Sequence, residues 1–221
     1  MYYTHLFFDL DGTLTDSKQG IFNSALYAAD KLGIPADKRP ADMMPFIGPP
    51  LRESFKLVFN IDDKTAELAT TYYREYYGKE GMYQYSIYDG IPEVLETLAT
   101  LGYNISVVTS KAEFFAKQII SKSPLKSFIT NISGCELNGN RSEKEVLIPY
   151  NANKLKVPLS KKILMIGDRL HDIRGARSAG ISSAGVLYGF GSLQEITTWN
   201  PDLIIPSANL LAQIIHSYNA S

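Results

Sequence analysis

The sequence has few of the features that mark secreted, membrane or nucleic-acid-binding proteins. Its 221 residues contain one cysteine, Cys135, which excludes an internal disulfide and fits a reducing cytoplasm. The 22 basic and 23 acidic residues give a formal net charge of −1 without a long block of one sign, so neither a nucleic acid polymer nor an anionic membrane is an expected partner. No apolar run is long enough to span a bilayer, and residues 1–5 lack the basic region of a signal peptide. A cytoplasmic location and small-molecule partners are therefore expected.

Short apolar runs alternate with helical patterns along most of the chain. This alternation predicts right-handed crossovers and a parallel α/β sheet of the Rossmann-like class. With 45% hydrophobic residues, the chain can build one sizeable domain with a large insertion, or two small ones. The strand-like runs are 6–8, 105–108, 128–132, 163–166, 183–187 and 203–205.

One long interval interrupts the alternation. Between the first and second runs lie nearly a hundred residues with several helical patterns and no convincing strand, and a plain crossover does not need so much chain. We therefore predict a helical cap domain at 17–86, inserted into an α/β core made of 1–16 and 87–221. A helical unit hinged above the carboxyl edge of a parallel sheet is well placed to act as a lid. The helical patterns are 21–32, 51–59, 66–77 and 91–101.

Four aspartates follow predicted buried strands and are expected to meet at the carboxyl edge of the sheet. Asp9 and Asp11 follow the first run, and Asp168 and Asp172 follow the fourth. Two such charges about 4 Å apart repel by roughly 4 kcal/mol at an effective dielectric near 20. A divalent cation would relieve this repulsion. Mg²⁺ suits an all-oxygen site that keeps some waters and takes a further ligand from a phosphate.

The same aspartates suit the hydrolysis of a phosphate monoester, which needs a metal, a nucleophile, a proton donor and a cation around one phosphoryl group. Asp9 can attack phosphorus and form an aspartyl-phosphate. Asp11 can protonate the leaving oxygen and then activate water. Asp168 and Asp172 lie about one helical turn apart and suit metal binding, although an acidic start to a helix is the simpler alternative.

A hydroxyl-rich segment, Thr109, Ser110 and Lys111, follows the second strand-like run. A hydroxyl there, together with the backbone amides that open the next helix, could hold phosphoryl oxygens. Serine and threonine are also common helix caps. The position directly after the neighbouring strand favours phosphate binding.

Three segments resemble signature motifs of the haloacid dehalogenase-like hydrolase superfamily. Segment 9–14, Asp-Leu-Asp-Gly-Thr-Leu, is similar to the first motif, segment 107–111 to the second and segment 167–176 to the fourth. The helical insertion is similar to the family's small cap, so the resemblance covers essentially the whole chain. The tail at 185–192 resembles the phosphoglycolate phosphatase and 5′-nucleotidase-like branch.

The resemblance implies a task for each aspartate. Asp9 would be the nucleophile and Asp11 the general acid and base, while Thr109 would contact the phosphoryl group. Mg²⁺ would be held by Asp9, the main-chain carbonyl of Asp11 and Asp168, with Asp172 in support. The dehalogenases of the superfamily lack the second aspartate, so Asp11 favours phosphoryl transfer over carbon–halogen cleavage.

The third family motif, a lysine early in a helix, is out of step in this sequence. In the branch that the chain resembles, the lysine stands three residues before the valine of a Lys-x-Glu-Val run. Here Glu143 occupies that place, and Lys144 follows one residue later. Because a helix turns by about 100° per residue, the Lys144 side chain is expected to miss the pocket unless the helix start shifts. Lys144 is our first candidate for the balancing cation, Lys111 is the second, and Arg141 is a further substitute.

Arg52 is a candidate outside the motifs. It lies in the insertion, where a cap residue could contact the substrate or its phosphate, and a solvated helix arginine is the alternative. With Arg52, we assign substrate binding to Gly12, Thr13, Ser110 and Lys111.

Together these features predict a Mg²⁺-dependent phosphatase that hydrolyses a phosphate monoester of a small metabolite through an aspartyl-phosphate. Phosphoglycolate, nucleotides and sugar phosphates are all candidate substrates. A homodimer is a candidate assembly. One alternative is a phosphomutase of the same fold, which would return the phosphoryl group to a sugar. The other is a non-catalytic sensor of a phosphorylated metabolite.

Overall fold

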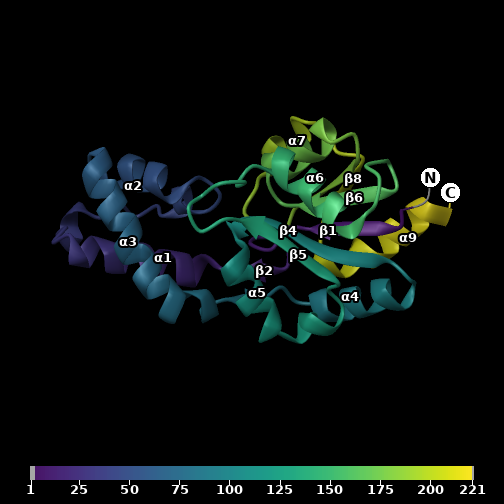
Figure 1. The fold of residues 1–221 in the computed structure, drawn as a ribbon, viewed down its shortest axis with the longest axis horizontal. Helices are drawn as coiled ribbons and strands as arrows, with labels where there is room; N and C mark the ends of the chain where they lie inside the picture. Colours follow the sequence, from purple (N-terminus) through teal and green to yellow (C-terminus); the bar gives the residue numbers. More distant parts are fainter. Residues whose placement is uncertain (1–2, 221) are drawn as a thin grey trace. The chain divides into compact units, whose positions relative to one another are not determined.

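Six parallel strands form the central sheet of the structure, a computed structural model in which residues 3–220 are described. The order across the sheet is β5-β4-β1-β6-β7-β8, and every pairing is parallel (Figure 1). This topology confirms the predicted parallel α/β fold. The strands are β1 (His5–Phe8), β4 (Asn104–Ala112), β5 (Asn131–Cys135), β6 (Ile163–Gly167), β7 (Ser182–Val186) and β8 (Leu203–Ile205).

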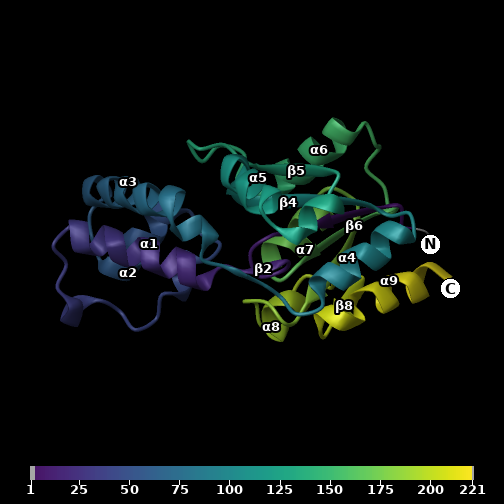
Figure 2. The same cartoon turned by 90° about the horizontal axis from the view of Figure 1, so that it is seen from below.

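Helices cover both faces of this sheet. On one face lie α6 (Lys144–Leu155) and α7 (Leu170–Ser178). On the other lie α4 (Ile91–Thr100), α5 (Glu113–Ser121) and α9 (Leu211–Ala220), as the two views in Figures 1 and 2 show. A sheet that is covered on both faces leaves its strand ends as the accessible edges, and that is where loops can carry polar groups. A further short helix, α8 (Leu193–Thr197), precedes β8.

The central strand β1 is apolar on both sides. Leu6, Phe7 and Phe8 are fully buried, because neighbouring strands flank β1 and helices cover it. Phe7 belongs to a buried cluster beneath α6 and α7 that also includes Val108 and Met165. This packing fixes the end of β1, and so the start of the loop that carries Asp9 and Asp11.

Residues 17–86 form a compact helical unit of their own, and the remaining residues form the other compact unit of the chain. The helical unit contains α1 (Lys18–Lys31), α2 (Leu51–Phe59) and α3 (Asp63–Lys79). Its interior is aromatic: the ring centroids of Phe46 and Phe55 are 4.8 Å apart, and those of Tyr73 and Tyr77 are 5.5 Å apart.

Several details differ from the sequence-based expectation. The strand β4 extends to Ala112, so residues 109–111 lie within it and not after it. The strand expected at 128–132 is β5, which begins at Asn131 and not at Phe128, because the 3-10 turn Pro124–Ser127 continues to its cap at Phe128. The interval that was predicted to lack strands contains β2 (Thr15–Asp16) and β3 (Ser86–Ile87), which form a two-stranded sheet. Strands of two residues are too short to show an apolar pattern.

The two ends of the described chain meet at the amino edge of the sheet. The rings of Tyr3 and Tyr218 stack with centroids 5.5 Å apart. The backbone N–H of Tyr3 donates a 2.8 Å hydrogen bond to the side chain of Asn219. The C-terminal helix α9 is therefore fastened beside the start of β1.

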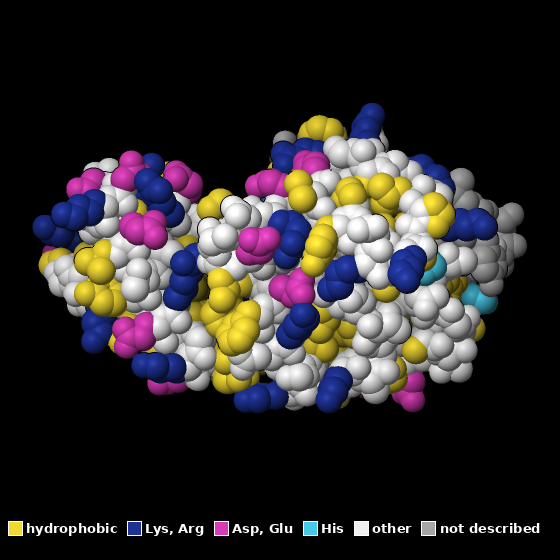
Figure 3. Space-filling model, in the orientation of Figure 1, with side chains coloured by type: hydrophobic (Ala, Val, Ile, Leu, Met, Phe, Trp, Pro, Cys, Tyr) yellow, Lys and Arg dark blue, Asp and Glu magenta, His cyan; other side chains and the backbone are white. Residues whose placement is uncertain are grey.

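The surface carries charges of both signs. On the face drawn in Figure 3, lysine and arginine side chains are interspersed with aspartate and glutamate, as the formal net charge of −1 leads one to expect. Within residues 3–220, no helix combines the length and the apolar character that a membrane crossing requires.

Candidate active site

Three aspartates converge at the carboxyl edge of the sheet. Asp9 directly follows β1 and Asp168 directly follows β6, its neighbour in the sheet, and the backbone N–H of Asp9 donates a 2.9 Å hydrogen bond to Ile166. Asp172 lies in the first turn of α7. One carboxylate oxygen from each of the three lies within 4.8 Å of the others.

The loop after β1 is shaped around Asp168. Gly12 has a φ of +84°, and a Cβ atom at this position would lie 2.2 Å from Oδ2 of Asp168. The hydroxyl of Thr13 donates a 3.2 Å hydrogen bond to Oδ1 of the same aspartate. Gly12 and Thr13, which were predicted to bind substrate, thus lie against a carboxylate of the site.

Lys144 is the cation that reaches the acidic cluster. Its Nζ atom lies 3.0 Å from Oδ1 of Asp9 and 2.5 Å from Oδ1 of Asp172, and it donates a 2.8 Å hydrogen bond to the carbonyl of Val108. The Lys144 side chain is 2% exposed. Three acceptors for the three ammonium protons leave this buried charge fully satisfied.

The expected displacement of Lys144 is absent, and the burial of α6 gives the reason. The sequence-based register took Val146 as the apolar position of the motif, but this side chain is 51% exposed. Leu147 and Ile148 face the core and are fully buried. Lys144 stands three residues before Leu147. If the buried Leu147 is taken as the apolar position of the motif, Lys144 has the spacing that the motif requires.

Burial and charge change the protonation of the cluster. Burial, with the nearby charges of Asp172 and Asp9, raises the pKa of Asp168 to about 8. Burial also raises the pKa of Asp9, although Lys144 opposes this shift. Burial lowers the pKa of Lys144, but Asp172 and Asp9 outweigh it and leave that pKa above its ordinary value. Burial is thus the largest cause of the raised pKa at both Asp9 and Asp168.

The donor set fits a hard divalent cation. The oxygens of Asp9, Asp168 and Asp172 are close enough to share one ion, and carboxylates are the ligands that Mg²⁺ prefers. In addition, Oδ1 of Asp11 is buried and has no hydrogen-bond partner within the described part of the chain. Asp172 is already engaged by Lys144 and by the backbone N–H of Arg169, at 3.1 Å. Asp9 is likewise engaged by Lys144, and Asp168 by Thr13 and Phe190, so all three carboxylates remain candidate ligands.

Asp11 and Lys111 form a second ion pair beside the cluster. The Nζ atom of Lys111 lies 2.7 Å from Oδ2 of Asp11, and the two side chains are 8% and 17% exposed. Lys111 follows Thr109, whose buried hydroxyl accepts a 3.2 Å hydrogen bond from the backbone N–H of Lys111. Both lysines weighed from the sequence therefore contact an aspartate, Lys144 at Asp9 and Lys111 at Asp11.

Three other candidates have different partners. The hydroxyl of Ser110 donates a 2.8 Å hydrogen bond to the carbonyl of Ser142. Within residues 3–220, Arg141 forms no ion pair with these aspartates, and its guanidinium lies 3.9 Å from the ring centroid of Tyr150. Arg52 belongs to the helical unit, where it is half exposed and pairs with Asp63 at 2.9 Å.

The segment after β7 contributes contacts that sequence reasoning missed. The backbone N–H of Phe190 donates a 2.8 Å hydrogen bond to Oδ2 of Asp168, and the hydroxyl of Tyr188 donates to the carbonyl of Thr13, at 3.0 Å. A Cβ atom at Gly189 would lie 2.3 Å from that of Asp168. The glycines of segment 185–192 were the available signal, but a family resemblance was inferred from that segment, and no contact with the aspartates.

Known proteins resemble this chain along nearly its full length. It is 38% identical to a 5′-nucleotidase of Pseudomonas aeruginosa, over 98% of this chain and 97% of that protein. It is 33% identical to the tyrosine-protein kinase PtkA of Mycobacterium tuberculosis, over 92% of this chain and 68% of that one. The crystal structure of a predicted phosphatase from Clostridium acetobutylicum superposes with a TM-score of 0.89 at 38% identity, covering 98% of this chain and 100% of the other.

The family model described as haloacid dehalogenase-like hydrolase matches residues 6–186. This span runs from β1 to the end of β7 and includes the aspartates that follow β1 and β6. The family resemblance noted in the sequence is thereby confirmed: the chain belongs to the haloacid dehalogenase-like hydrolase family.

Proposed function

We propose that this protein is a Mg²⁺-dependent phosphatase that hydrolyses a phosphate monoester of a small metabolite. The observation that supports this most is the arrangement of Lys144, which joins Asp9 and Asp172 beside Asp168 at the carboxyl edge of the sheet. A nucleophile, a buried cation and an oxygen donor set are what positioning and charge stabilisation of a phosphoryl group require.

In the proposed reaction, an oxygen of the Asp9 carboxylate attacks phosphorus, and the bond from phosphorus to the leaving oxygen breaks. Asp11 gives a proton to that leaving oxygen. Water then attacks the aspartyl-phosphate, Asp11 takes a proton from that water, and inorganic phosphate leaves with Asp9 restored. Lys144 holds Asp9 in place and carries positive charge next to it. When bound by Asp9 and Asp168, Mg²⁺ would neutralise charge on the phosphoryl oxygens.

The substrate class that we test first is nucleoside monophosphates, because the P. aeruginosa relative is a 5′-nucleotidase. We further propose that the helical unit, residues 17–86, is a cap domain that contacts the part of the substrate beyond the phosphate. Arg52 is our candidate contact on it. A cytoplasmic location remains a proposal that rests on the single cysteine.

The test is phosphate release from a panel of monoesters, with and without Mg²⁺, by wild type and by Asp9→Asn. Asparagine keeps the shape of the side chain but cannot form the acyl phosphate. We expect Mg²⁺-dependent release from at least one ester and a loss of at least about 10³-fold in Asp9→Asn, since a covalent step is removed. Circular dichroism checks that the variant is folded. Retained turnover would exclude Asp9 as the nucleophile.

Product analysis separates the alternatives. A phosphomutase would convert a sugar monophosphate into its isomer, while a phosphatase would release free phosphate and the sugar. The likeness to PtkA motivates one more arm, in which labelled ATP and a tyrosine peptide are supplied. A sensor without catalysis would bind esters and release phosphate from none of them.

A further inference from the structure

Arg141 adopts a backbone conformation that side chains seldom occupy. Its φ is +59°, in the left-handed region, where most residues other than glycine are strained. Such a conformation persists only when the surrounding contacts enforce it. Arg141 lies three residues before Lys144, at the end of the loop that leads into α6.

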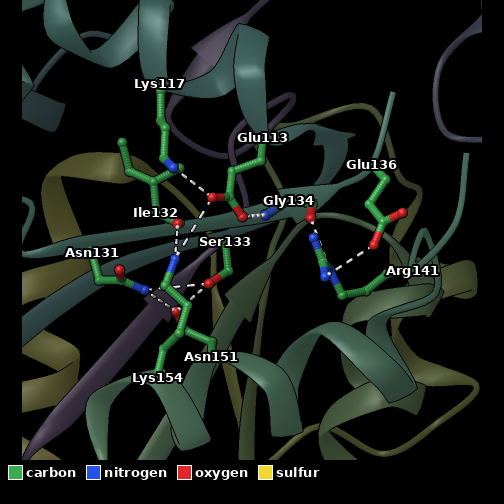
Figure 4. Close-up of polar contacts among 10 residues, drawn as sticks. All are labelled: Glu113, Lys117, Asn131, Ile132, Ser133, Gly134, Glu136, Arg141, Asn151 and Lys154. Atoms are coloured by element: carbon green, nitrogen blue, oxygen red, sulfur yellow. Dashed lines mark hydrogen bonds and ion pairs between the residues drawn. The ribbon is translucent and has the colours of Figure 1, made fainter. Parts of the chain in front are cut away.

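The Arg141 side chain is fastened on three sides. Its guanidinium carbon lies 3.9 Å from the ring centroid of Tyr150 on α6, within the range of a cation–π contact. Nε donates to the carbonyl of Gly134 at 3.3 Å, and Nη1 donates to Glu136 at 3.4 Å, as drawn in Figure 4. The side chain is only 20% exposed. These contacts tie the loop to β5 and to α6 at once.

The backbone of Gly134, which accepts the hydrogen bond from Arg141, is itself held by several contacts. The register between β4 and β5 shifts after Val108, so regular pairing is lost near Gly134. There the backbone N–H of Gly134 donates to the carboxylate of Glu113 at 3.3 Å. Glu113 is held by Lys117 at 2.6 Å and by Lys154 at 3.7 Å (Figure 4). A Cβ atom at Gly134 would lie 2.5 Å from the carbonyl of Lys111, so this backbone also packs against the end of β4.

The residues that follow Arg141 lead directly into the site. The carbonyl of Ser142 accepts the 2.8 Å hydrogen bond from Ser110, which follows Thr109 on β4. Lys144 comes two residues later and contacts Asp9. A change in the direction of the chain at Arg141 would therefore displace both Lys144 and the segment of β4 that is proposed to bind phosphate.

We propose that Arg141 is a positioning residue: clamped between Tyr150, Gly134 and Glu136, it sets the course of the loop before α6, and thereby the positions of Ser110 and Lys144. The proposal builds on the proposed phosphatase activity only for its kinetic readout. It assigns Arg141 a task other than that of balancing cation.

The test compares side-chain loss with backbone strain. Arg141→Ala and Arg141→Gly both remove the clamp, but glycine relieves the strain at φ +59°. We expect kcat for the best monoester to fall roughly 10- to 100-fold in both variants, with KM changed much less, because a misplacement of about 1 Å costs up to about 10² in rate. Tyr150→Phe keeps the ring and should retain wild-type kcat, while Tyr150→Leu should lower it.

Lys156 offers a matched control. It is an exposed basic residue at φ +56°, at the opposite end of α6. Lys156→Gly relieves the same kind of backbone strain and Lys156→Ala keeps it. Neither variant changes the contacts of Arg141, so kcat should stay unchanged. Hydrogen exchange followed by mass spectrometry supplies a readout that does not need activity. The segments 107–112 and 140–147 should exchange faster in Arg141→Gly and remain as in wild type in Lys156→Gly.

Two results would overturn the proposal. The first is an Arg141→Gly variant with wild-type kcat, which would mean that the side chain positions nothing. The second is unchanged exchange in both segments of that variant. If the wild type releases phosphate from no ester, the proposed function fails, and the exchange comparison still decides the case of Arg141.

Discussion

At the scale of single residues, Gly12 is a position where a methyl group decides the geometry of the site. Its φ is +84°, and a Cβ atom would lie 2.2 Å from Asp168. We expect Gly12→Ala to destabilise the fold by about 1 kcal/mol or more from backbone strain. The clash would also displace Asp168 and abolish Mg²⁺-dependent activity. Thermal unfolding and phosphate release measure the two effects.

Gly102 is the matched control for this substitution. Its φ is +87°, and a Cβ atom there would meet nothing within 4 Å among the described residues. Gly102→Ala should carry the strain alone, with a lowered Tm and unchanged kcat. Equal activity in the two alanine variants would contradict the role given to Gly12.

Lys144 shows how far residue types can be interpreted without a structure. The sequence indicated a lysine near the start of a helix, but Val146 and Leu147 are both apolar, and the sequence does not say which one faces the core. The structure buries Leu147 and exposes Val146. The contacts of Lys144 thus depend on a helix register that tertiary packing sets. The hydrogen bond from Phe190 to Asp168 was out of reach for a related reason, since a backbone N–H has no signature of its own.

At the scale of elements, the contact between α6 and α7 depends on Gly175. A Cβ atom there would lie 2.5 Å from Cβ of Lys144. Inside a helix, replacing glycine by alanine normally stabilises by up to about 1 kcal/mol. Here we expect the opposite sign, because the two helices must separate and α6 carries Lys144 away from Asp9. Gly175→Ala should lower both Tm and kcat.

Ser178→Ala on the same helix serves as the comparison, since this residue is exposed at the end of α7. Its Tm and kcat should match those of wild type. A Gly175→Ala protein that is more stable than wild type and fully active would show that the helix contact tolerates the methyl group.

The elements themselves were largely predictable. Buried parallel strands such as β1 and β6 are continuous apolar runs, and the run pattern identified them. The start of β5 was missed because the apolar Phe128 belongs to the end of a 3-10 turn. The short strands β2 and β3 have two residues each, fewer than any pattern needs.

At the scale of the whole molecule, metal binding should appear as stability. A ligand that binds only the folded state at a hundred times its Kd stabilises by about 2.7 kcal/mol. For a chain of this size, that corresponds to a rise in Tm of roughly 5–10 °C. We expect Mg²⁺ to produce such a rise in the wild type and little or none in Asp168→Asn. Differential scanning calorimetry with and without a chelator measures it.

Asp37→Asn, an exposed position in the helical unit, is the control and should keep the full response to Mg²⁺. An equal shift in Asp168→Asn would place the ion elsewhere.

The sequence predicted a large helical insertion because one interval was too long for a crossover. Specificity could not be predicted, because the sequence does not show which side chains contact a substrate.

The stacked rings of Tyr3 and Tyr218 have a practical consequence. They bring both ends of the described chain to the amino edge of the sheet, whereas the aspartates lie at its carboxyl edge. A resin, a tag or a fused protein attached near residue 3 or residue 220 would therefore lie at the edge of the sheet opposite the aspartates. Immobilising the protein through these two segments should therefore keep the proposed active site away from the support.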